Sequence, residues 1–297
     1  MRVFLTGASG WIGSALISEL CNAGHDVVGL ARSDASAAKV ESVGATAIRG
    51  DLADLDVLRT QAAQADGVVH CGYLHDFSRM GDAATLDRGA IEAFGEALAG
   101  TGKPLVVTSG IGLLRPGRVA TERDRHALGS GGHPRADNAE LALALADRKV
   151  RVSVVRPAPT VHGDGDHGFI PFVIGIARRT GISGYVGDGS NRWSAVHRFD
   201  CANLFKRALE DAPAGSVLHA VAEEGIPTRE IAETIGRALD VPARSVEPAD
   251  AHAHFDWMAT FWSADIPASS AITQQTLNWQ PSRPGLIADL EARHYFT

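Results

Sequence analysis

Apolar and polar residues form two kinds of block along the first half of the chain. Short, near-continuous apolar runs predict buried strands, and segments with apolar residues every three or four positions predict amphipathic helices. The predicted strands are Val3–Thr6, Asp26–Leu30, Thr46–Arg49, Gly67–Cys71, Leu105–Ser109 and Val150–Val155. The predicted helices are Ile12–Leu20, Ala35–Val43, Leu55–Gln64, Asp82–Leu98 and Asp137–Asp147. This alternation is typical of a parallel sheet covered on both faces, so we predict an α/β, doubly wound Rossmann fold.

The pattern changes after Arg156-Pro157, where irregular segments rich in Gly, His and aromatic residues begin. We predict a Rossmann domain over residues 1–156 and, over 157–297, mainly a smaller, interleaved substrate-binding lobe. A strand near 217–221 is predicted to return to the sheet. Further helices are predicted at Asp200–Glu210, Thr228–Leu239, Asp250–Phe261 and Pro284–Arg293, with Thr228 as a cap.

The net charge of the chain limits the classes of partner that it could bind. Its 297 residues include 28 Lys+Arg and 35 Asp+Glu, for a net charge of −7, and no basic stripe, which argues against nucleic acid or an anionic membrane. The first residues enter a strand directly and no apolar run reaches membrane-spanning length, so we expect a cytoplasmic protein with a small-molecule substrate. Cys21, Cys71 and Cys201 lie far apart in apolar settings, which favours reduced thiols over a metal or redox site.

A glycine-rich turn follows the first predicted strand and opens a helix. Its members are Gly7, Ser9, Gly10, Trp11, Ile12 and Gly13. Gly7 permits the tight turn, Gly10 lets a pyrophosphate approach the backbone, and Gly13 lets helix and strand pack closely. A structural glycine turn is the rival interpretation. The strand before and the helix after it favour a dinucleotide cofactor, with the phosphates at the helix N-terminus.

The residues after the second predicted strand bear on the choice of nicotinamide. NAD-binding proteins of this fold place an acidic residue there, whereas this chain has Ala31 followed by Arg32 and Ser33. A guanidinium pairs well with a 2′-phosphate, so we predict NADP, with NAD still open. The alternative is an exposed Arg32 paired with Asp34.

The whole chain resembles the extended or atypical short-chain dehydrogenase/reductase superfamily, in the branch of NAD-dependent epimerases and dehydratases. The likeness rests on the glycine turn and on Gly50–Leu52, Val68–Gly72, Val107–Gly110, Arg156–Gly163, Val186–Asp200 and Asn278–Pro281, in this order. The resemblance implies cofactor contacts by Asp51, Leu52, His70, Cys71, Gly72, Pro157 and Thr160. It also implies that a homodimer is common among such proteins.

The catalytic pair of that family is missing. The family carries a tyrosine and, four residues later, a lysine on the helix after the fifth strand. The only tyrosines here are Tyr73, Tyr185 and Tyr295, and none has a lysine four residues on. Spacing back from Glu140 places His133 and Asp137 at the two positions.

Another group must then supply the proton for hydride transfer, and four residues are candidates. Ser109 ends the fifth predicted strand, and its alternative role is to cap the turn that follows. Tyr73 follows the fourth predicted strand, and its alternative role is packing at the surface. His133 and His162 are candidates because an imidazole ordinarily titrates near neutral pH. For His162, packing beside the cofactor is an equally good explanation. His75 lies nearby, and His70 is better explained as a core histidine.

We therefore predict an NADP-preferring oxidoreductase that transfers hydride to or from a small or medium carbonyl, alcohol or imine-type substrate. Aromatic residues of the second half favour an apolar substrate; they are Phe169, Phe172, Tyr185, Trp193, Phe255, Trp257, Phe261 and Trp262. One alternative is a nucleotide-sugar epimerase or dehydratase that uses Arg192 and Arg198 as cations for the diphosphate. The other is a catalytically silent NADP-binding sensor.

Overall fold

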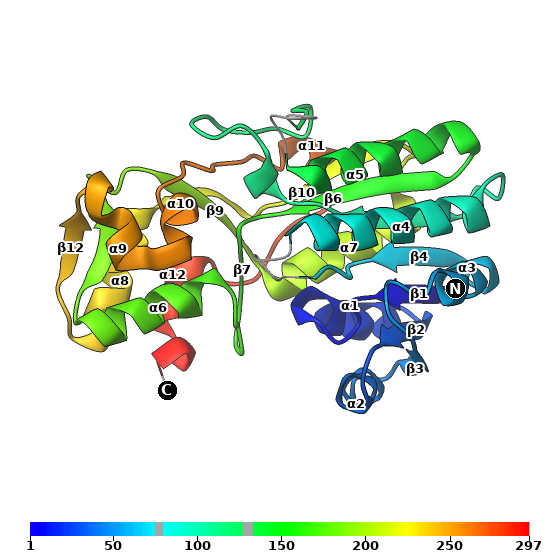
Figure 1. Cartoon of the computed structure of the whole chain (residues 1–297), viewed down its shortest axis with the longest axis horizontal. Coiled ribbons are helices and arrows are strands. Elements are labelled where there is room, and N and C mark those ends of the chain that lie inside the picture. Colours follow the sequence, from blue (N-terminus) through cyan, green and yellow to red (C-terminus); the bar gives the residue numbers. More distant parts are fainter. Residues whose placement is uncertain (75–79, 127–132, 297) are drawn as a thin grey trace.

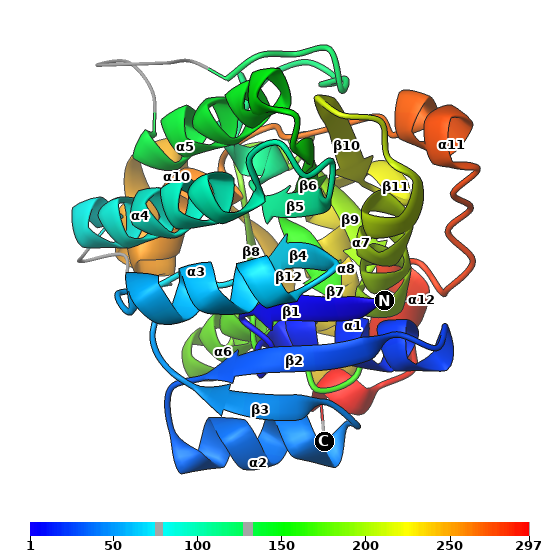
Figure 2. The same ribbon diagram turned by 90° about the vertical axis from the view of Figure 1, so that its right-hand side faces the viewer.

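A parallel sheet forms the centre of the larger lobe. The structure is a computed structural model that describes residues 1–74, 80–126 and 133–296. Its seven-stranded sheet has the order β10-β6-β5-β4-β1-β2-β3, and every neighbouring pair is parallel. The strands are β1 Arg2–Thr6, β2 Asp26–Ala31, β3 Thr46–Arg49, β4 Gly67–His70, β5 Pro104–Thr108, β6 Arg151–Pro157 and β10 Ser216–Ala220. The predicted Rossmann fold is confirmed (Figure 2).

The strand order reverses between β1 and β4. From β1 the chain moves to β2 and β3 on one side, and then crosses to β4, β5 and β6 on the other. Open parallel sheets bind ligands at such a switch point, beyond the carboxyl ends of the strands. Thr6 of β1 pairs with His70 of β4, so the segments that follow these two residues leave the sheet side by side.

Helices cover both faces of the sheet. The helices α3 Leu55–Gln64, α4 Met80–Leu98 and α5 Pro134–Leu143 pack on one another on one face, and α1 Trp11–Asn22 packs on α7 Arg198–Asp211 on the other (Figure 2). Helix α2 Asp34–Ser42 lies beside β2 and β3, and α11 Ala271–Leu277 lies beside β10. None of the helices in the described ranges combines the length and apolar character needed to cross a membrane.

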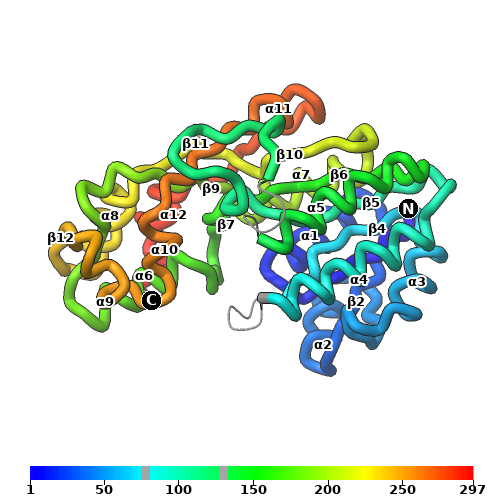
Figure 3. The backbone as a smooth tube through the Cα atoms, turned by 45° about the horizontal axis from the view of Figure 1, so that its top comes forward, coloured from blue at the N-terminus to red at the C-terminus, as the bar shows by residue number. Residues whose placement is uncertain are grey.

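A smaller lobe contains most of the remaining elements (Figures 1 and 3). Its strands are β7 Thr160–His162, β8 Ser183–Val186, β9 Arg192–His197, β11 Glu223–Pro227 and β12 Ala243–Val246. Its helices are α6 Phe169–Thr180, α8 Thr228–Leu239, α9 Ala251–Phe255, α10 Ala259–Trp262 and α12 Leu286–Glu291. Short 3-10 helices span Ile111–Leu113, Ala144–Arg148, Pro248–Asp250, Asp256–Met258 and His294–Phe296. The chain passes between the lobes several times, since α7 and β10 lie in the larger one.

Two local predictions in the smaller lobe are wrong. The single helix expected over Asp250–Phe261 is broken, because Asp256 has a φ of 54° and separates α9 from α10. Thr228 does not cap α8; the cap position is Pro227, and the Thr228 hydroxyl donates to Asn191 Oδ1 at 2.6 Å. The alternation of apolar and polar residues was also too irregular to predict α6 or the five strands of this lobe.

Candidate functional site

The turn after β1 brings backbone segments closer than side chains would permit. Gly7 has a φ of 68°, and a Cβ atom there would lie 2.6 Å from the carbonyl carbon of Cys71. A Cβ atom on Gly13 would lie 2.1 Å from the Gly7 carbonyl oxygen. Gly10 is exposed and precedes α1, and no side chain caps this helix. The turn is thus a cradle that a side chain would fill, with free N–H groups for a pyrophosphate.

The other residues of the turn support it. Ser9 is half-buried and Ile12 packs against the core. The Trp11 indole donates from Nε1 to a carbonyl oxygen of β7 at 2.7 Å, and the Arg198 guanidinium lies 3.8 Å from the centre of the Trp11 ring. Arg198 also donates from Nη2 to Ser14 Oγ at 3.1 Å. Trp11 therefore joins the glycine turn to the smaller lobe, and Arg198, at the start of α7, packs on Trp11.

Two arginines lie together where β2 and β3 end. The Arg32 side chain is 70% exposed, and its Nε lies 4.0 Å from Asp51 Oδ2. Arg49 Nη2 donates to the Arg32 carbonyl oxygen at 3.2 Å, and Arg49 Nη1 lies 3.4 Å from Asp34 Oδ1. Asp34 is therefore the partner of Arg49, not of Arg32. Arg49 is the last residue of a predicted strand, a position that carries no cofactor signal in the sequence.

The neighbouring loop residues have structural roles. Ser33 Oγ accepts the Ser36 backbone N–H at 3.2 Å and caps α2, so its hydroxyl is already engaged. Leu52 is half-buried after β3, and a Cβ atom on Gly72 would lie 3.1 Å from its Cδ2 atom. The loop after β3 therefore packs against the segment after β4.

At the end of β4, backbone atoms rather than side chains face the edge of the sheet where a cofactor would bind. His70 is 1% exposed, with Nδ1 2.7 Å from Thr6 Oγ1 and Nε2 3.1 Å from Asp87 Oδ1. Its side chain is therefore committed to the core and has no surface for a cofactor. The Gly72 N–H donates to Thr6 Oγ1 at 3.1 Å. Burial raises the pKa of the Cys71 thiol to about 12, which keeps it neutral.

Tyr73 and Arg135 meet at this edge from different elements. Tyr73 follows β4, and Arg135 lies in the first turn of α5, with its guanidinium carbon 3.9 Å from the centre of the Tyr73 ring. Arg135 Nη2 donates to the Thr108 carbonyl oxygen at the end of β5, at 3.4 Å. Within the described residues, the buried Arg135 Nε has no hydrogen-bond partner. Burial raises the pKa of Tyr73, and the Arg135 cation partly offsets that rise.

Ser109, the residue after β5, has a buried imidazole as its neighbour. Ser109 Oγ lies 3.4 Å from His126 Nε2, and His126 Nδ1 lies 3.3 Å from Arg156 Nη2. Arg156 Nη1 lies 3.5 Å from His219 Nε2, and His219 Nδ1 lies 2.8 Å from the Ser269 carbonyl oxygen. The two imidazoles and the guanidinium are almost completely buried. Sequence spacing gave no signal for His126.

This cluster predicts an acid-sensitive fold. Burial, followed by the Arg156 cation and His219, lowers the pKa of His126 from its ordinary 6.5 to about 4; Glu140 Oε1, at 3.9 Å from Nδ1, is the nearest opposing charge. Between about pH 6.5 and pH 4, the imidazole of His126 is protonated in the unfolded chain but neutral in the folded protein. Protonation therefore favours the unfolded chain, and the free energy of unfolding falls as the pH is lowered through this range. Each pKa unit corresponds to about 1.4 kcal/mol, so we expect a loss of roughly 3 kcal/mol.

Melting curves over this pH range measure the effect. His126→Gln removes one of the two imidazoles of the cluster whose pKa is lowered, so it should reduce the pH dependence of Tm, whereas exposed His252→Gln should not. Equal slopes for the two variants would contradict the predicted pKa of His126.

The other predicted site residues lie apart from this cluster. His133 precedes α5, and its Nδ1 accepts the Arg135 backbone N–H at 3.1 Å. His162 is fully buried, with Nδ1 2.8 Å from Asp289 Oδ2, so the structure does not support its expected role as a proton donor. Pro157 ends β6 and Thr160 begins β7, where it is buried. His75 is outside the described residues.

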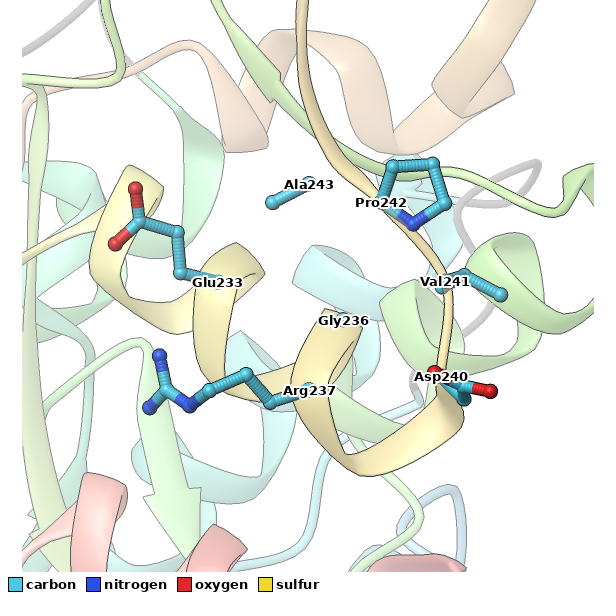
Figure 4. A pocket seen from close by; sticks show the side chains of 7 residues that line it. All are labelled: Glu233, Gly236, Arg237, Asp240, Val241, Pro242 and Ala243. Carbon is cyan, nitrogen blue, oxygen red and sulfur yellow. The ribbon is translucent and has the colours of Figure 1, made fainter.

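Two surface hollows involve none of the predicted residues. One, of about 520 Å³, is at the end of α8 (Figure 4). Its lining residues are Glu233, Gly236, Arg237, Asp240, Val241, Pro242 and Ala243. The other, of about 700 Å³, is lined in part by Glu140 and Arg156, which are neighbours of His126.

The glycine cradle at the switch point, the free helix N-terminus and the adjoining loops define a dinucleotide-binding protein of the Rossmann type. Residues 7–171 match a family model described as NAD(P)H-binding, which covers more than half of the chain. The chain belongs to this NAD(P)H-binding family. The binding of a nicotinamide nucleotide, which the resemblance to extended short-chain dehydrogenases/reductases implied, is confirmed at the level of this family.

Individual relatives extend over the full chain. An uncharacterized protein of Schizosaccharomyces pombe is 48% identical over 297 residues, 100% of both chains. The 4-hydroxy-2-methyl-3-oxo-4-farnesyl-3,4-dihydroquinoline-1-oxide ketoreductase of Stigmatella aurantiaca is 28% identical, over 99% of this chain and 90% of that one. The structure of MoeE5 in complex with UDP-glucose and NAD has a TM-score of 0.77 and 23% identity, and covers 99% of this chain and 97% of that one. That likeness concerns the fold.

Proposed function

We propose that the chain is an NADP-preferring oxidoreductase that interconverts a small or medium carbonyl compound, or its imine analogue, and the reduced product. The observation that carries this proposal is the meeting of Tyr73 and Arg135 beside the ends of β4 and β5. A phenol and a cation lie where the glycine cradle would direct the nicotinamide end of a dinucleotide. They replace the tyrosine and lysine that the sequence lacks.

The roles of the residues follow from the chemistry of carbonyl reduction. When bound, the reduced nicotinamide supplies a hydride to the carbonyl carbon. The π electrons of the C=O bond move to the oxygen, which takes the proton of the Tyr73 hydroxyl and becomes an alcohol. Arg135 stabilises the phenolate left behind, and solvent returns its proton. Ser109 donates a hydrogen bond to the substrate oxygen as negative charge develops there.

The preference for NADP rests on Arg32 and Arg49. The side chains of both arginines are largely exposed. They lie at the carboxyl ends of β2 and β3, where Ala31 of β2 pairs with Arg49 of β3. Ala31 leaves no carboxylate to bind the ribose hydroxyls of NAD. Two exposed cations fit the charge of a 2′-phosphate, and Arg49 orients the backbone of Arg32 through its hydrogen bond.

Charge removal tests this preference. We expect Arg32→Ala to weaken NADPH binding by roughly 1.5–3 kcal/mol, because it removes a charge-assisted hydrogen bond, and to leave NADH binding unchanged. Arg49→Ala should act in the same direction with a smaller effect. Titration calorimetry with both nucleotides gives the two affinities, and Lys39→Ala, which removes an exposed cation of α2, is the matched control. A native preference for NADH, or equal losses for both nucleotides, would contradict the assignment.

Contacts in the smaller lobe favour an apolar substrate. The half-buried rings of Phe169 and Phe261 stack with centres 5.6 Å apart, and Trp257 lies 4.7 Å from Phe172. Trp193, Phe255 and Trp262 are fully buried and form the core of the lobe.

The two cations expected to bind a diphosphate, Arg192 and Arg198, are already engaged. Arg192 binds Asp265 through Nε and Nη2 at 3.0 and 2.9 Å, and Arg198 lies on Trp11. The diphosphate of a nucleotide sugar would have to displace these contacts. The ketoreductase name of one relative also supports a carbonyl substrate.

Direct assay tests the function. The purified protein is mixed with NADPH and a panel of ketones, aldehydes and imines, and the absorbance of the reduced nicotinamide is followed. UDP-glucose is included as the probe for the nucleotide-sugar alternative. Oxidation of NADPH by apolar carbonyl compounds is the expected result. Tight NADPH binding without turnover of any compound would instead favour the sensor.

A further inference from the structure

The hydrogen-bond donors around His126 decide which of its nitrogens bears a proton. Arg156 Nη2, 3.3 Å from His126 Nδ1, is a guanidinium nitrogen and can only donate. Nδ1 of His126 must then accept, so the neutral ring carries its hydrogen on Nε2. The low pKa of His126 keeps the ring in this neutral form at neutral pH. Consequently His126 Nε2 donates to Ser109 Oγ at 3.4 Å.

The opposite side of Arg156 fixes the same arrangement. His219 Nδ1 faces the Ser269 carbonyl oxygen at 2.8 Å, which can only accept, so His219 carries its hydrogen on Nδ1. Its Nε2 is then free to accept from Arg156 Nη1 at 3.5 Å. Arg156 Nη1 also donates to the Asp124 carbonyl oxygen at 2.9 Å. The guanidinium is thereby held between two imidazoles and cannot turn away from His126.

The direction of the His126 hydrogen bond determines what Ser109 can do. Because Ser109 Oγ accepts from His126, its own hydrogen must point elsewhere, and no second partner of this hydroxyl is found among the described residues. In the opposite tautomer, Ser109 would donate to His126 and turn lone pairs towards a substrate oxygen, which would repel it. Polarisation of the imidazole by the Arg156 cation strengthens the bond from Nε2.

We propose that His126, held by Arg156, is a positioning residue that directs the Ser109 hydroxyl hydrogen onto the substrate oxygen. This inference rests on the proposed oxidoreductase function. His126 transfers no proton itself, and its effect on turnover passes entirely through Ser109.

A double-mutant cycle tests whether His126 acts through Ser109. Ser109→Ala should lower kcat by roughly 10²-fold, the lower end of the cost of losing one oxyanion donor, and His126→Leu by roughly tenfold. The double variant should lose no more than Ser109→Ala alone. His126→Gln, whose amide can still donate, should recover most of kcat, and NADPH affinity should stay unchanged throughout. Exposed His252→Leu is the control for loss of an imidazole.

Three kinetic outcomes would overturn the inference while leaving the oxidoreductase function intact. In the first, the losses of kcat in the two single variants multiply in the double variant. In the second, Ser109→Ala keeps the full kcat, and in the third His126→Leu changes KM but not kcat.

A spectroscopic measurement needs no turnover. Nitrogen-15 NMR of histidine-labelled protein, with the His126 signals identified from their absence in His126→Gln, reports which ring nitrogen is protonated. We expect hydrogen on Nε2 at neutral pH and a change in the Nε2 signal in Ser109→Ala. Hydrogen on Nδ1 would overturn the inference whether or not the protein reduces a carbonyl compound, whereas absence of NADPH oxidation would count against the proposed function.

Discussion

Replacing Tyr73 by phenylalanine is expected to lower kcat for carbonyl reduction by roughly 10²–10⁴-fold, the usual cost of losing general acid catalysis. Phenylalanine keeps the ring beneath the Arg135 guanidinium, so packing and NADPH affinity should be preserved. Steady-state kinetics and calorimetry measure the two quantities. Tyr185→Phe is the matched control, because Arg229 likewise lies over that ring, at 5.6 Å, but in the smaller lobe.

The pH profile separates the phenol from a histidine donor. The pKa of Tyr73 is raised by burial, so its hydroxyl keeps its proton well above neutral pH, and reduction should continue up to about pH 10. A histidine donor would lose activity at about pH 6–8. Arg135→Leu should also lower kcat, because it removes the cation that stabilises the phenolate. Full activity in Tyr73→Phe, or a decline of the parent protein near neutral pH, would exclude Tyr73 as the donor.

The second large effect is expected at the glycine turn, where Gly10→Val should abolish nucleotide binding and keep the fold. Gly10 has a φ of −76°, which valine can adopt, and the nearest atom to an added Cβ is the Gly7 carbonyl oxygen at 3.0 Å. The larger side chain would occupy the place of the pyrophosphate. Calorimetry should detect no NADPH binding, while circular dichroism should remain native.

Two other glycines provide the comparison. Gly13→Ala places its Cβ 2.1 Å from a backbone oxygen that cannot move away, so it should lower Tm as well as NADPH affinity. Gly175→Val, in α6 and with nothing within 4 Å, should change neither. Retained NADPH affinity in a natively folded Gly10→Val variant would show that the cofactor binds elsewhere.

The contrast between Tyr73 and His162 shows how far the sequence could indicate catalytic groups. Tyr73 follows a segment that resembles a cofactor-contacting motif, and His162 lies within another. Yet Tyr73 contacts a cation at the edge of the sheet, whereas His162 is buried against Asp289. Arg135 had a signal: it is the only arginine or lysine between His133 and Glu140, on the helix that should carry the catalytic pair. His126 had none, because its role depends on Arg156 and His219, which come from two later strands.

The sequence by itself determined the parallel sheet, the glycine cradle and the absence of the tyrosine-lysine pair, since these depend on local periodicity, spacing and composition. Only the tertiary structure decided which side chains meet. Arg49 rather than Arg32 pairs with Asp34, Arg135 lies over Tyr73, and His126 faces Ser109. Each of these contacts joins separate strands, loops or helices. Their partners are set by sheet order, register and burial, which no short stretch of sequence encodes.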